Sequence, residues 1–340
     1  KKYGSYKMTQ KPKLETVAHE AGVSLATASQ VMRGKGRISE TTRKRVLAAA
    51  DKLNYVPNGR AASMRSGVSK EIGMAIHDIA NPFNAEVISG VSDLLDGEGY
   101  LVSILDSRDD ANIQRRHLES FIGNSRGGLI WVPAENTPGS TVELLKTQRI
   151  PTVSFLRHLQ NNLFDHIGIK NAEAIGKAVE YLQSLGHHKI AYLGGEANSG
   201  VRIERLNGFR AAMRNITPNP LVWPSHDDKI SGKNAMQDLL SKYPQTTAVV
   251  CNGDMVAIGA LAACSQLKYV VGKDISVIGF DGTQDAEIAT PGLTTLAVNP
   301  YEIGRKLAQA LLNRIGLPDM PVTDSLVSAD LVIRKSTGPT

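Results

Sequence analysis

Residues 17–33 hold the pattern that most constrains the fold of this chain, because they read as two short helices joined by a tight turn. The apolar face of the first helix is formed by residues at helical spacing: Leu14, Val17, Ala18 and Ala21. In the turn, Gly22 has no Cβ to clash at positive φ, and Ser24 is the expected N-cap of the second helix. A third helix is expected at 39–53. The pattern predicts a helix-turn-helix, a motif that presents its second helix to the major groove of DNA.

The outer face of the second helix carries side chains suited to reading DNA. Gln30 can pair with adenine through two hydrogen bonds, and Leu25 and Ala26 can contact thymine methyl groups. Thr27 and Ser29 can donate hydrogen bonds to phosphate oxygens. We therefore predict a DNA-contacting surface made of Ser24, Leu25, Ala26, Thr27, Ser29 and Gln30.

The charge of the chain is divided unevenly along its length. Residues 1–70 carry 15 Lys and Arg against 4 Asp and Glu, a net of +11, whereas the remainder carries 24 against 29, a net of −5. The basic start favours a module that binds a polyanion, with a basic tail beside a globular domain as the alternative. Further phosphate contacts are expected from Arg43, Lys44 and Arg45 on the third helix.

Length and composition bound the remaining possibilities. A chain of 340 residues suggests two or three domains. No apolar run reaches the ~20 residues of a membrane helix, and no apolar signal segment opens the chain, so neither membrane insertion nor export is expected. The cysteines, Cys251 and Cys264, lack metal-ligand spacing and indicate no disulfide framework, which fits a cytoplasmic location. No metal or cofactor is predicted.

From Glu71 onward, predicted strands and helices alternate. Strands are expected at 72–76, 100–105, 128–132, 151–155, 189–193, 248–251 and 276–280, with helices between them. Alternation of this kind favours parallel sheets covered by helices on both faces. There are too many units for one small sheet, so the fold class is α/β with two doubly wound lobes. Ligands would then bind in a cleft at the carboxyl ends of the strands.

One segment makes a family resemblance plain: TVAHEAGVSLATASQVMRGKGRISETTRKRVLAAADKLNYVPNGRAASMRSG. Its Ala-Gly-Val-Ser turn, its Val-Ser-x-x-Thr-x-Ser helix start and its Leu-Asn-Tyr-Val-Pro-Asn exit resemble the headpiece of the LacI/GalR family of bacterial transcription regulators. The resemblance continues through the body, from about residue 13 onward. It implies a homodimeric regulator, expected to be a repressor, that binds a pseudo-palindromic operator in double-stranded DNA. It also implies control by a carbohydrate-like effector held in a body similar to periplasmic binding proteins.

The resemblance divides the chain into four parts. Residues 1–12 are expected to be an expression remnant or a disordered arm, 13–57 the headpiece, 58–70 a hinge helix and linker, and 71–340 the effector-binding and dimerisation domain. The hinge is too short to be a stable helix alone, so we expect it to fold on DNA. The resemblance places Asn58, Ala61 and Met64 at the DNA, with Met64 where the family has a leucine wedge for the minor groove.

The effector site follows from strand ends and from family positions. Asp281 follows the strand ISVIGF, and Arg205 stands in the segment RIERLNGF. The resemblance implies that both contact the effector, although a solvated carboxylate and a surface arginine are the alternatives. Asn81 and Phe83 match positions that line the same cleft, and Phe83 could instead pack in the core. Asp254 follows a glycine where the family often has asparagine.

Two further departures suggest the chemistry of the effector. Leu156-Arg157 and Lys170-Asn171 stand where the family commonly has Asp-Arg and Asp-Asn. Arg157, Lys170 and Arg205 would then face the cleft with few carboxylates opposite them. Because an unpaired buried cation is costly, we expect an acidic effector such as a sugar acid or sugar phosphate. The alternative is that Lys170 turns outward to solvent.

Two other classes of protein are weaker interpretations of this sequence. A periplasmic solute-binding protein would share the body, but it would need an export signal and would have no basic headpiece. A hydrolase or transferase would need a catalytic arrangement. The chain has no G-x-G-x-x-G after a strand, no Walker loop and no G-x-S-x-G elbow, so we predict that it is not an enzyme.

Overall fold

The computed structural model describes residues 11–57, 69–124, 127–159, 163–197 and 199–340. Contacts within the chain divide it into two compact units, residues 1–67 and 68–340. The predicted hinge residues Asn58, Ala61 and Met64 lie outside the described residues.

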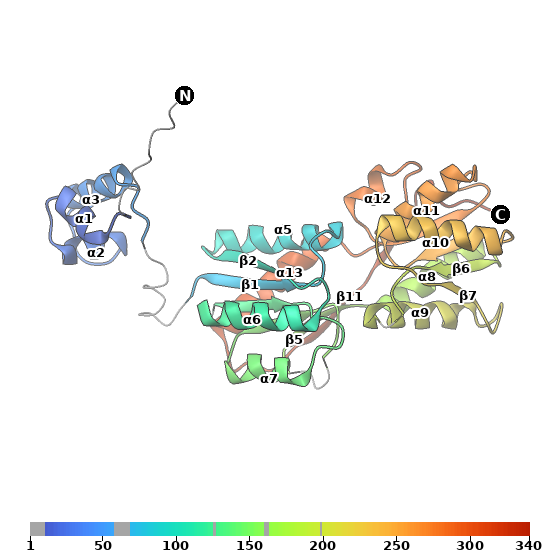
Figure 1. The fold of residues 1–340 in the computed structure, drawn as a ribbon, viewed down its shortest axis with the longest axis horizontal. Coiled ribbons are helices and arrows are strands. Elements are labelled where there is room, and N and C mark those ends of the chain that lie inside the picture. Colours follow the sequence, from blue (N-terminus) through green and yellow to red (C-terminus); the bar gives the residue numbers. More distant parts are fainter. Residues whose placement is uncertain (1–10, 58–68, 125–126, 160–162, 198) are drawn as a thin grey trace, which may run out of the picture. The chain divides into compact units, whose positions relative to one another are not determined.

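The first unit is the predicted helix-turn-helix followed by a third helix (Figure 1). Its helices are α1 (Leu14–Glu20), α2 (Leu25–Met32) and α3 (Glu40–Lys52). Gly22 has a φ of 59° in the turn, and the Ser24 side chain caps α2 by accepting a hydrogen bond from the Thr27 N–H at 3.1 Å. Ser39 caps α3 in the same way. The apolar faces meet in a small core of Val17, Ala18, Ala21, Ala28, Val31, Val46, Ala49 and Ala50. These findings confirm the predicted motif.

The second unit, called the body here, contains two six-stranded sheets. The first has the order β11-β5-β4-β3-β1-β2, formed by β1 (Glu71–Ile76), β2 (Leu101–Asp106), β3 (Gly128–Trp131), β4 (Thr152–Phe155), β5 (Asp165–Ile169) and β11 (Asp324–Val327). The second has the order β12-β10-β9-β8-β6-β7, formed by β6 (Ile190–Leu193), β7 (Leu221–Trp223), β8 (Ala248–Cys251), β9 (Ser276–Asp281), β10 (Thr294–Ala297) and β12 (Asp330–Val332). Only the β10–β12 pair is antiparallel among the strand pairs described.

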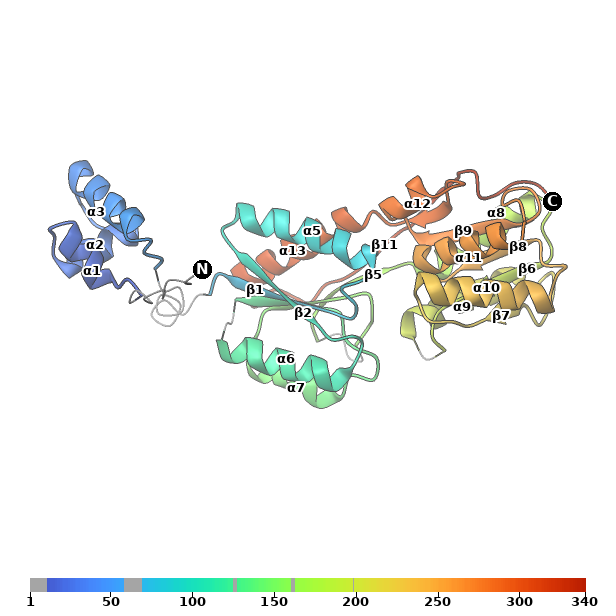
Figure 2. The same cartoon turned by 45° about the horizontal axis from the view of Figure 1, so that its top comes forward.

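Helices cover both faces of each sheet, which makes two doubly wound lobes (Figure 2). The first lobe has α5 (Pro82–Gly97), α6 (Ala111–Asn124), α7 (Gly139–Thr147) and α13 (Pro300–Gly316). The second has α8 (Asn171–Ser184), α9 (Gly200–Met213), α10 (Lys229–Lys242), α11 (Asp254–Gln266) and α12 (Gln284–Ile288). The predicted α/β fold class is confirmed.

The chain passes between the lobes three times, after β5, after β10 and after β11. As a result α13 and β11 return to the first lobe, although they come late in the sequence. Helix α13 packs closely on α5, because a Cβ at Gly304 would lie 2.1 Å from the Val87 carbonyl oxygen and one at Gly90 would lie 2.0 Å from that of Tyr301. Only glycine permits such an approach of two helix backbones.

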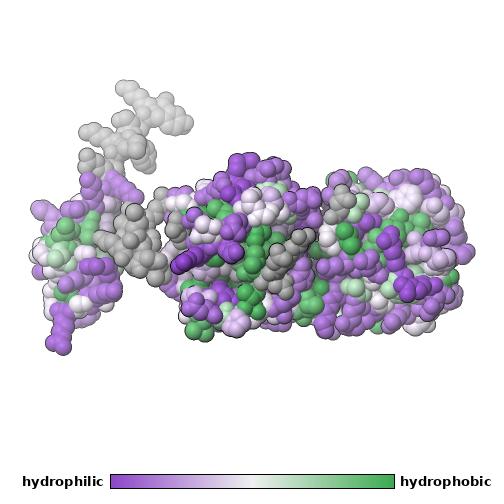
Figure 3. Space-filling view, turned by 90° about the horizontal axis from the view of Figure 1, so that it is seen from below, coloured by the Kyte–Doolittle hydropathy of each residue, from purple (hydrophilic) through white to green (hydrophobic). Residues whose placement is uncertain are grey.

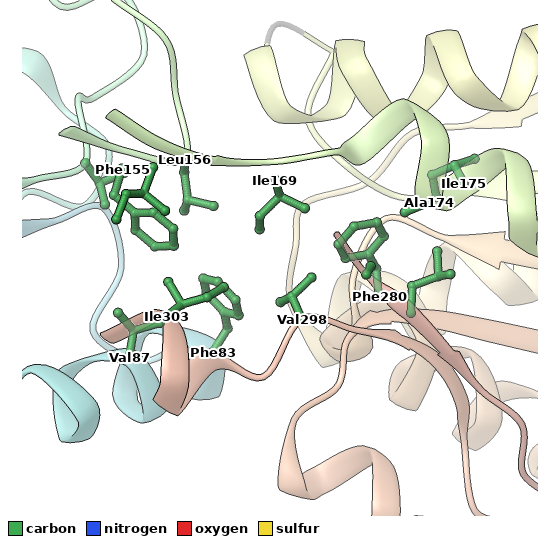
Figure 4. Packing of buried hydrophobic residues seen from close by; sticks show 14 of the residues in the cluster. Phe83, Val87, Phe155, Leu156, Ile169, Ala174, Ile175, Phe280, Val298 and Ile303 are labelled. Atoms are coloured by element: carbon green, nitrogen blue, oxygen red, sulfur yellow. The ribbon is translucent and has the colours of Figure 1, made fainter. Parts of the chain in front are cut away.

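One apolar core cluster extends through both lobes (Figure 4). Phe83 and Phe155 stack in the first lobe, with ring centroids 6.1 Å apart, and Phe280 belongs to the second. Ile169, at the end of β5, and Val298, on the segment that follows β10, lie between these groups where the chain begins to cross. The crossings are therefore part of the core rather than loose linkers.

The surface of the body that Figure 3 shows is mostly hydrophilic, with smaller hydrophobic patches. None of the helices in the described ranges has both the length and the apolar character that crossing a bilayer requires.

Candidate functional site

The first unit presents the predicted DNA-contacting residues on the outer face of α2. Leu25 is 45% exposed, and Ala26 and Gln30 are exposed as well. Thr27 and Ser29 are half-buried, and the Thr27 hydroxyl lies 2.9 Å from that of Ser24. The positions are compatible with groove and phosphate contacts, and the individual roles stay predictions.

The body contains a polar cleft of about 620 Å³ between the two lobes. It lies where strands of both sheets end, as the topology of doubly wound sheets predicts. The first lobe contributes His77, Asp78, Asn81, Phe83, Arg108, Asp109, Glu135, Asn136, Leu156 and Arg157. The second contributes Glu196, Ser199, Val201, Arg205, His226, Asp227, Asp228, Asn252, Gly253, Met255 and Asp281.

The structure brings five of the predicted effector residues together in this cleft: Asn81, Phe83, Arg157, Arg205 and Asp281. Asn81 caps α5 by accepting a hydrogen bond from the Phe83 N–H at 3.0 Å. Phe83 is only 4% exposed, so most of its ring packs in the core and little of it faces the cleft.

Arg157 is held by carboxylates of its own lobe. Its guanidinium donates to both oxygens of Asp109, at 2.5 and 2.9 Å, and its Nε lies 3.0 Å from Glu135. Burial acts to raise the pKa of Asp109, but the hydrogen bonds and charge of Arg157 outweigh it and hold that pKa below its usual range. Arg157 is thus already neutralised within the protein.

Arg205 is also engaged within the protein. It is 4% exposed, donates to Asn171 Oδ1 at 2.9 Å and to the Asn252 carbonyl, and lies 3.6 Å from Asp281 Oδ1. Its guanidinium lies 3.6 Å from the centroid of the Phe280 ring. Burial raises the pKa of Asp281 well above its ordinary value, although the charge of Arg205 opposes the shift.

Lys170 is not among the residues that line the cleft, so the structure gives its predicted effector contact no support. Its side chain is 42% exposed and lies 3.7 Å from Glu173 on the first turn of α8. The long stem carries the ammonium group to water, where ion pairing costs little desolvation. Of the two arrangements considered for Lys170, the structure has the outward one.

Asp254 is not among the cleft-lining residues either, and the structure places it behind the cleft wall instead of at the predicted effector contact. It is 1% exposed and accepts hydrogen bonds from the N–H groups of Gly282 and Thr283 and from the hydroxyls of Thr283 and Thr295. Burial raises its pKa to about 6 despite these bonds. Its role is to hold the turn behind Asp281.

Sequence reasoning missed most of the acidic residues of the cleft. Among the described residues, seven carboxylates line it: Asp78, Asp109, Glu135, Glu196, Asp227, Asp228 and Asp281. Against them stand three arginines and two histidines: Arg108, Arg157, Arg205, His77 and His226. Several acids follow strands directly, for example in IHD after β1 and in SRDD after β2. The rule that ligands bind at strand ends could have found them.

The pKa values of the two histidines of the cleft are shifted in opposite directions. Burial, helped by the charge of Arg157, lowers the pKa of His77 to about 4, so this ring is neutral at physiological pH. Its Nδ1 atom is buried without a hydrogen-bond partner among the described residues. His226 is exposed and bonds Glu196 at 2.6 Å, and this bond raises the pKa of His226.

A helix-turn-helix joined to a two-lobed body with a polar cleft defines a class of protein: regulators that combine a DNA-binding motif with a ligand receptor. Comparisons with known families agree with each part. Residues 13–58 match the family model described as bacterial regulatory proteins, lacI family, and residues 179–337 match the periplasmic binding protein-like domain.

Curated relatives match nearly the whole chain. The transcriptional repressor PurR of Haemophilus influenzae (strain PittEE) is 30% identical over 329 residues, which is 95% of this chain and 98% of PurR. The repressor CytR of Escherichia coli (strain K12) is 29% identical over 328 residues, covering 95% and 96% of the two chains. The chain therefore belongs to the LacI family of bacterial regulatory proteins, and it is a helix-turn-helix transcription regulator.

Solved structures support the same assignment. A Lac repressor dimer bound to operator and the anti-inducer ONPF has a TM-score of 0.83 and 26% identity, covering 97% of this chain and all of that chain. A complex of the transcriptional regulator CelR with cellobiose has a TM-score of 0.71 and 27% identity, covering 96% and 99%. These relatives are repressors or regulators, and no enzyme family is indicated.

Proposed function

We propose that this regulator binds a pseudo-palindromic DNA duplex as a homodimer and that a small molecule in the cleft controls the binding. The exposed outer face of α2, capped at Ser24 and placed in a basic unit, carries the DNA-binding part of the proposal. The Lac repressor structure, a dimer on its operator, supports it by likeness. The predicted contacts of Asn58, Ala61 and Met64 belong to this proposal and remain to be tested.

Salt dependence tests the DNA-binding proposal. A duplex is first selected from a random library with the full chain, and its affinity is then measured by fluorescence anisotropy. The affinity should fall by orders of magnitude between about 50 and 200 mM salt, because phosphate contacts release counterions. The double variant Arg43→Ala/Lys44→Ala should have a shallower dependence. A flat response in the parent chain contradicts the proposal.

For the effector, we propose an uncharged polyhydroxylated molecule such as a sugar, in place of the anion expected from the sequence. That expectation required free cations in the cleft. Arg157 and Arg205 are paired, and Lys170 lies outside. Carboxylates accept hydrogen bonds from hydroxyl groups but repel an anion. The cellobiose bound by CelR supports a sugar-type ligand by likeness.

Calorimetry with matched ligands tests the effector proposal. A thermal-shift screen of sugars, beginning with cellobiose, identifies a binder, because a ligand that binds the folded state raises its stability. The sugar should bind more tightly than its aldonate or phosphate, and Asp281→Asn should weaken the binding. Arg108 is an exposed cation that lines the cleft, so Arg108→Ala shows whether a positive charge contributes to binding. Tighter binding of the acid, lost in Arg108→Ala, would show that the effector is an anion.

A further inference from the structure

We propose that the first lobe binds a divalent transition-metal ion, Zn²⁺ being the best match, through His158, His166 and Asp324. None of the three lines the effector cleft. Their candidate ligand atoms all lie within 4.8 Å of one another. The proposed site is separate from the function proposed above and does not depend on it.

The sheet topology brings the three residues together from distant parts of the sequence. His166 on β5 and Asp324 on β11 are register partners in neighbouring parallel strands, so their side chains share one face of the sheet. His158 stands between β4 and β5, and its ring centroid lies 3.9 Å from that of His166. Asp324 and His158 are exposed, so an ion could reach the site from solvent.

Hydrogen bonding fixes the tautomer of His166. The Ser154 hydroxyl donates its one proton to the Asp165 carbonyl at 3.1 Å, so it can only accept from the ring at 2.9 Å. His166 Nδ1 therefore carries the hydrogen, and Nε2 carries a lone pair. A histidine that ligates a metal through one nitrogen usually donates from the other in this way.

The lone pair of His166 has no partner. His166 is 4% exposed, and its Nε2 atom is buried without a hydrogen bond among the described residues. A buried acceptor left without a donor costs about 1–3 kcal/mol, so a metal ion there would satisfy a real deficit. The space beside Nε2 depends on Gly168, since a Cβ at that position would lie 2.9 Å from this atom.

The donor set selects the kind of ion. Two imidazoles and one carboxylate suit Zn²⁺ and its neighbours, and they leave a fourth position for water. Bonds of about 2.0–2.1 Å in a tetrahedral site place ligand atoms roughly 3.3 Å apart. The side chains of His158 and Asp324 are exposed, so they can rotate to bring their ligand atoms from within 4.8 Å to this shorter distance. The buried ring of His166 stays fixed.

The site would connect to the cleft through the backbone. His158 follows Arg157, which holds Asp109 and Glu135 at the cleft wall. The other side of the site is anchored, because buried Asp165 bonds Arg314 of α13 at 2.7 Å. A bound ion would therefore fix the segment that carries Arg157 against a rigid sheet edge.

The first test is direct metal binding. Zn²⁺ is titrated into the untagged full chain, freed of metal with a chelator, in competition with a chromophoric chelator. We expect one ion per chain and a loss of affinity of at least about tenfold in His158→Ala and in Asp324→Asn, since losing a ligand should cost no less than losing a supporting group. His188→Ala and Asp330→Asn change exposed residues outside the site and should keep the parent affinity.

Two further variants test whether Zn²⁺ binds at His158, His166 and Asp324 and not at another histidine of the chain. Ser154→Ala should weaken Zn²⁺ binding about 10–100-fold in a metal-free chain that is still folded by circular dichroism, because Ser154 positions the ring without being a ligand. His226→Ala should have no effect. Absence of Zn²⁺ binding, or binding that is lost in His226→Ala but kept in His158→Ala, would overturn the proposal.

Discussion

Asp254 supports the cleft from behind, by holding the turn that carries Asp281. The hydrogen bonds that it accepts from Gly282, Thr283 and Thr295 fix the backbone at the end of β9, where Asp281 has a φ of 115°. A residue other than glycine needs such support in that conformation. The carboxylate is thus used for structure, although its sequence position suggests a ligand contact.

We predict that Asp254→Ala destabilises the body by at least about 2 kcal/mol, because it leaves several buried donors without an acceptor. Chemical denaturation, followed by circular dichroism, measures the change. Asp254→Asn keeps the shape and one acceptor oxygen, so it should cost less. Equal stability of the alanine variant and the parent chain would contradict the structural role.

His77 should make the body sensitive to acid. Its folded-state pKa of about 4 lies below the ordinary value of 6.5, so the unfolded chain binds the proton more readily between these limits. The unfolding free energy should fall as pH drops from about 6.5 towards 4. His77→Gln should reduce that slope, while exposed His188→Ala should leave it unchanged. An identical slope in His77→Gln would rule out the shift.

At the scale of single elements, we expect α2 to determine which DNA sequence is preferred. We predict that Gln30→Ala costs about 1–3 kcal/mol at one cognate base pair and relaxes the preference there, because its exposed amide can pair with adenine. Binding to a panel of single-base operator variants measures it. Lys44→Ala should instead weaken all sequences similarly. A uniform loss in Gln30→Ala would place this residue outside the groove.

The elements that were predicted well are those whose signals are local. Ser24 and Ser39 marked helix starts, Gly22 marked the turn, and apolar spacing identified the inward residues, all of which the structure confirms. Strands β1, β2, β3, β4, β6, β8 and β9 of the body were also predicted. Local periodicity and capping are enough for such elements, because they depend on neighbours in the sequence.

Some of the elements that were missed depend on distant partners. Strands β5, β7, β10, β11 and β12 were not predicted; of these, β11 is defined by pairing with β5 and β12 by pairing with β10, both far away in the sequence. Helix α13 was also missed, although Asn299 and Pro300 are a recognisable start signal. The charge of the cleft was misjudged for the same reason. Asp109 and Glu135 meet Arg157 only through the fold.

At the scale of the whole body, two carboxylates of the first lobe contact the second. Glu135 accepts from the Gly200 N–H at 3.0 Å, and Glu86 accepts from the Gln284 N–H at 3.0 Å. Both donors stand at the start of a helix of the second lobe, where an anion is favoured. These contacts hold the lobes in the observed arrangement.

We predict that Glu86→Ala weakens effector binding about two- to fivefold. Without the Glu86–Gln284 hydrogen bond, the effector alone has to stabilise the observed arrangement of the two lobes. Glu86 does not line the cleft, so direct contact is not removed. Calorimetry with the sugar found in the screen measures the effect, and exposed Glu98→Ala is the control. Unchanged affinity in Glu86→Ala would show that this contact does not bias the lobes.

The late return of α13 and β11 to the first lobe has a consequence for synthesis of the chain. A ribosome releases residues in order, so the sheet begun by β1 receives its outer strand only when Val327 has emerged. Until α13 has emerged, the face of α5 around Val87 and Val91, which α13 covers in the finished body, stays open to water and to other chains. The lobe that is made first is completed last, so nascent chains should depend on chaperones for its protection.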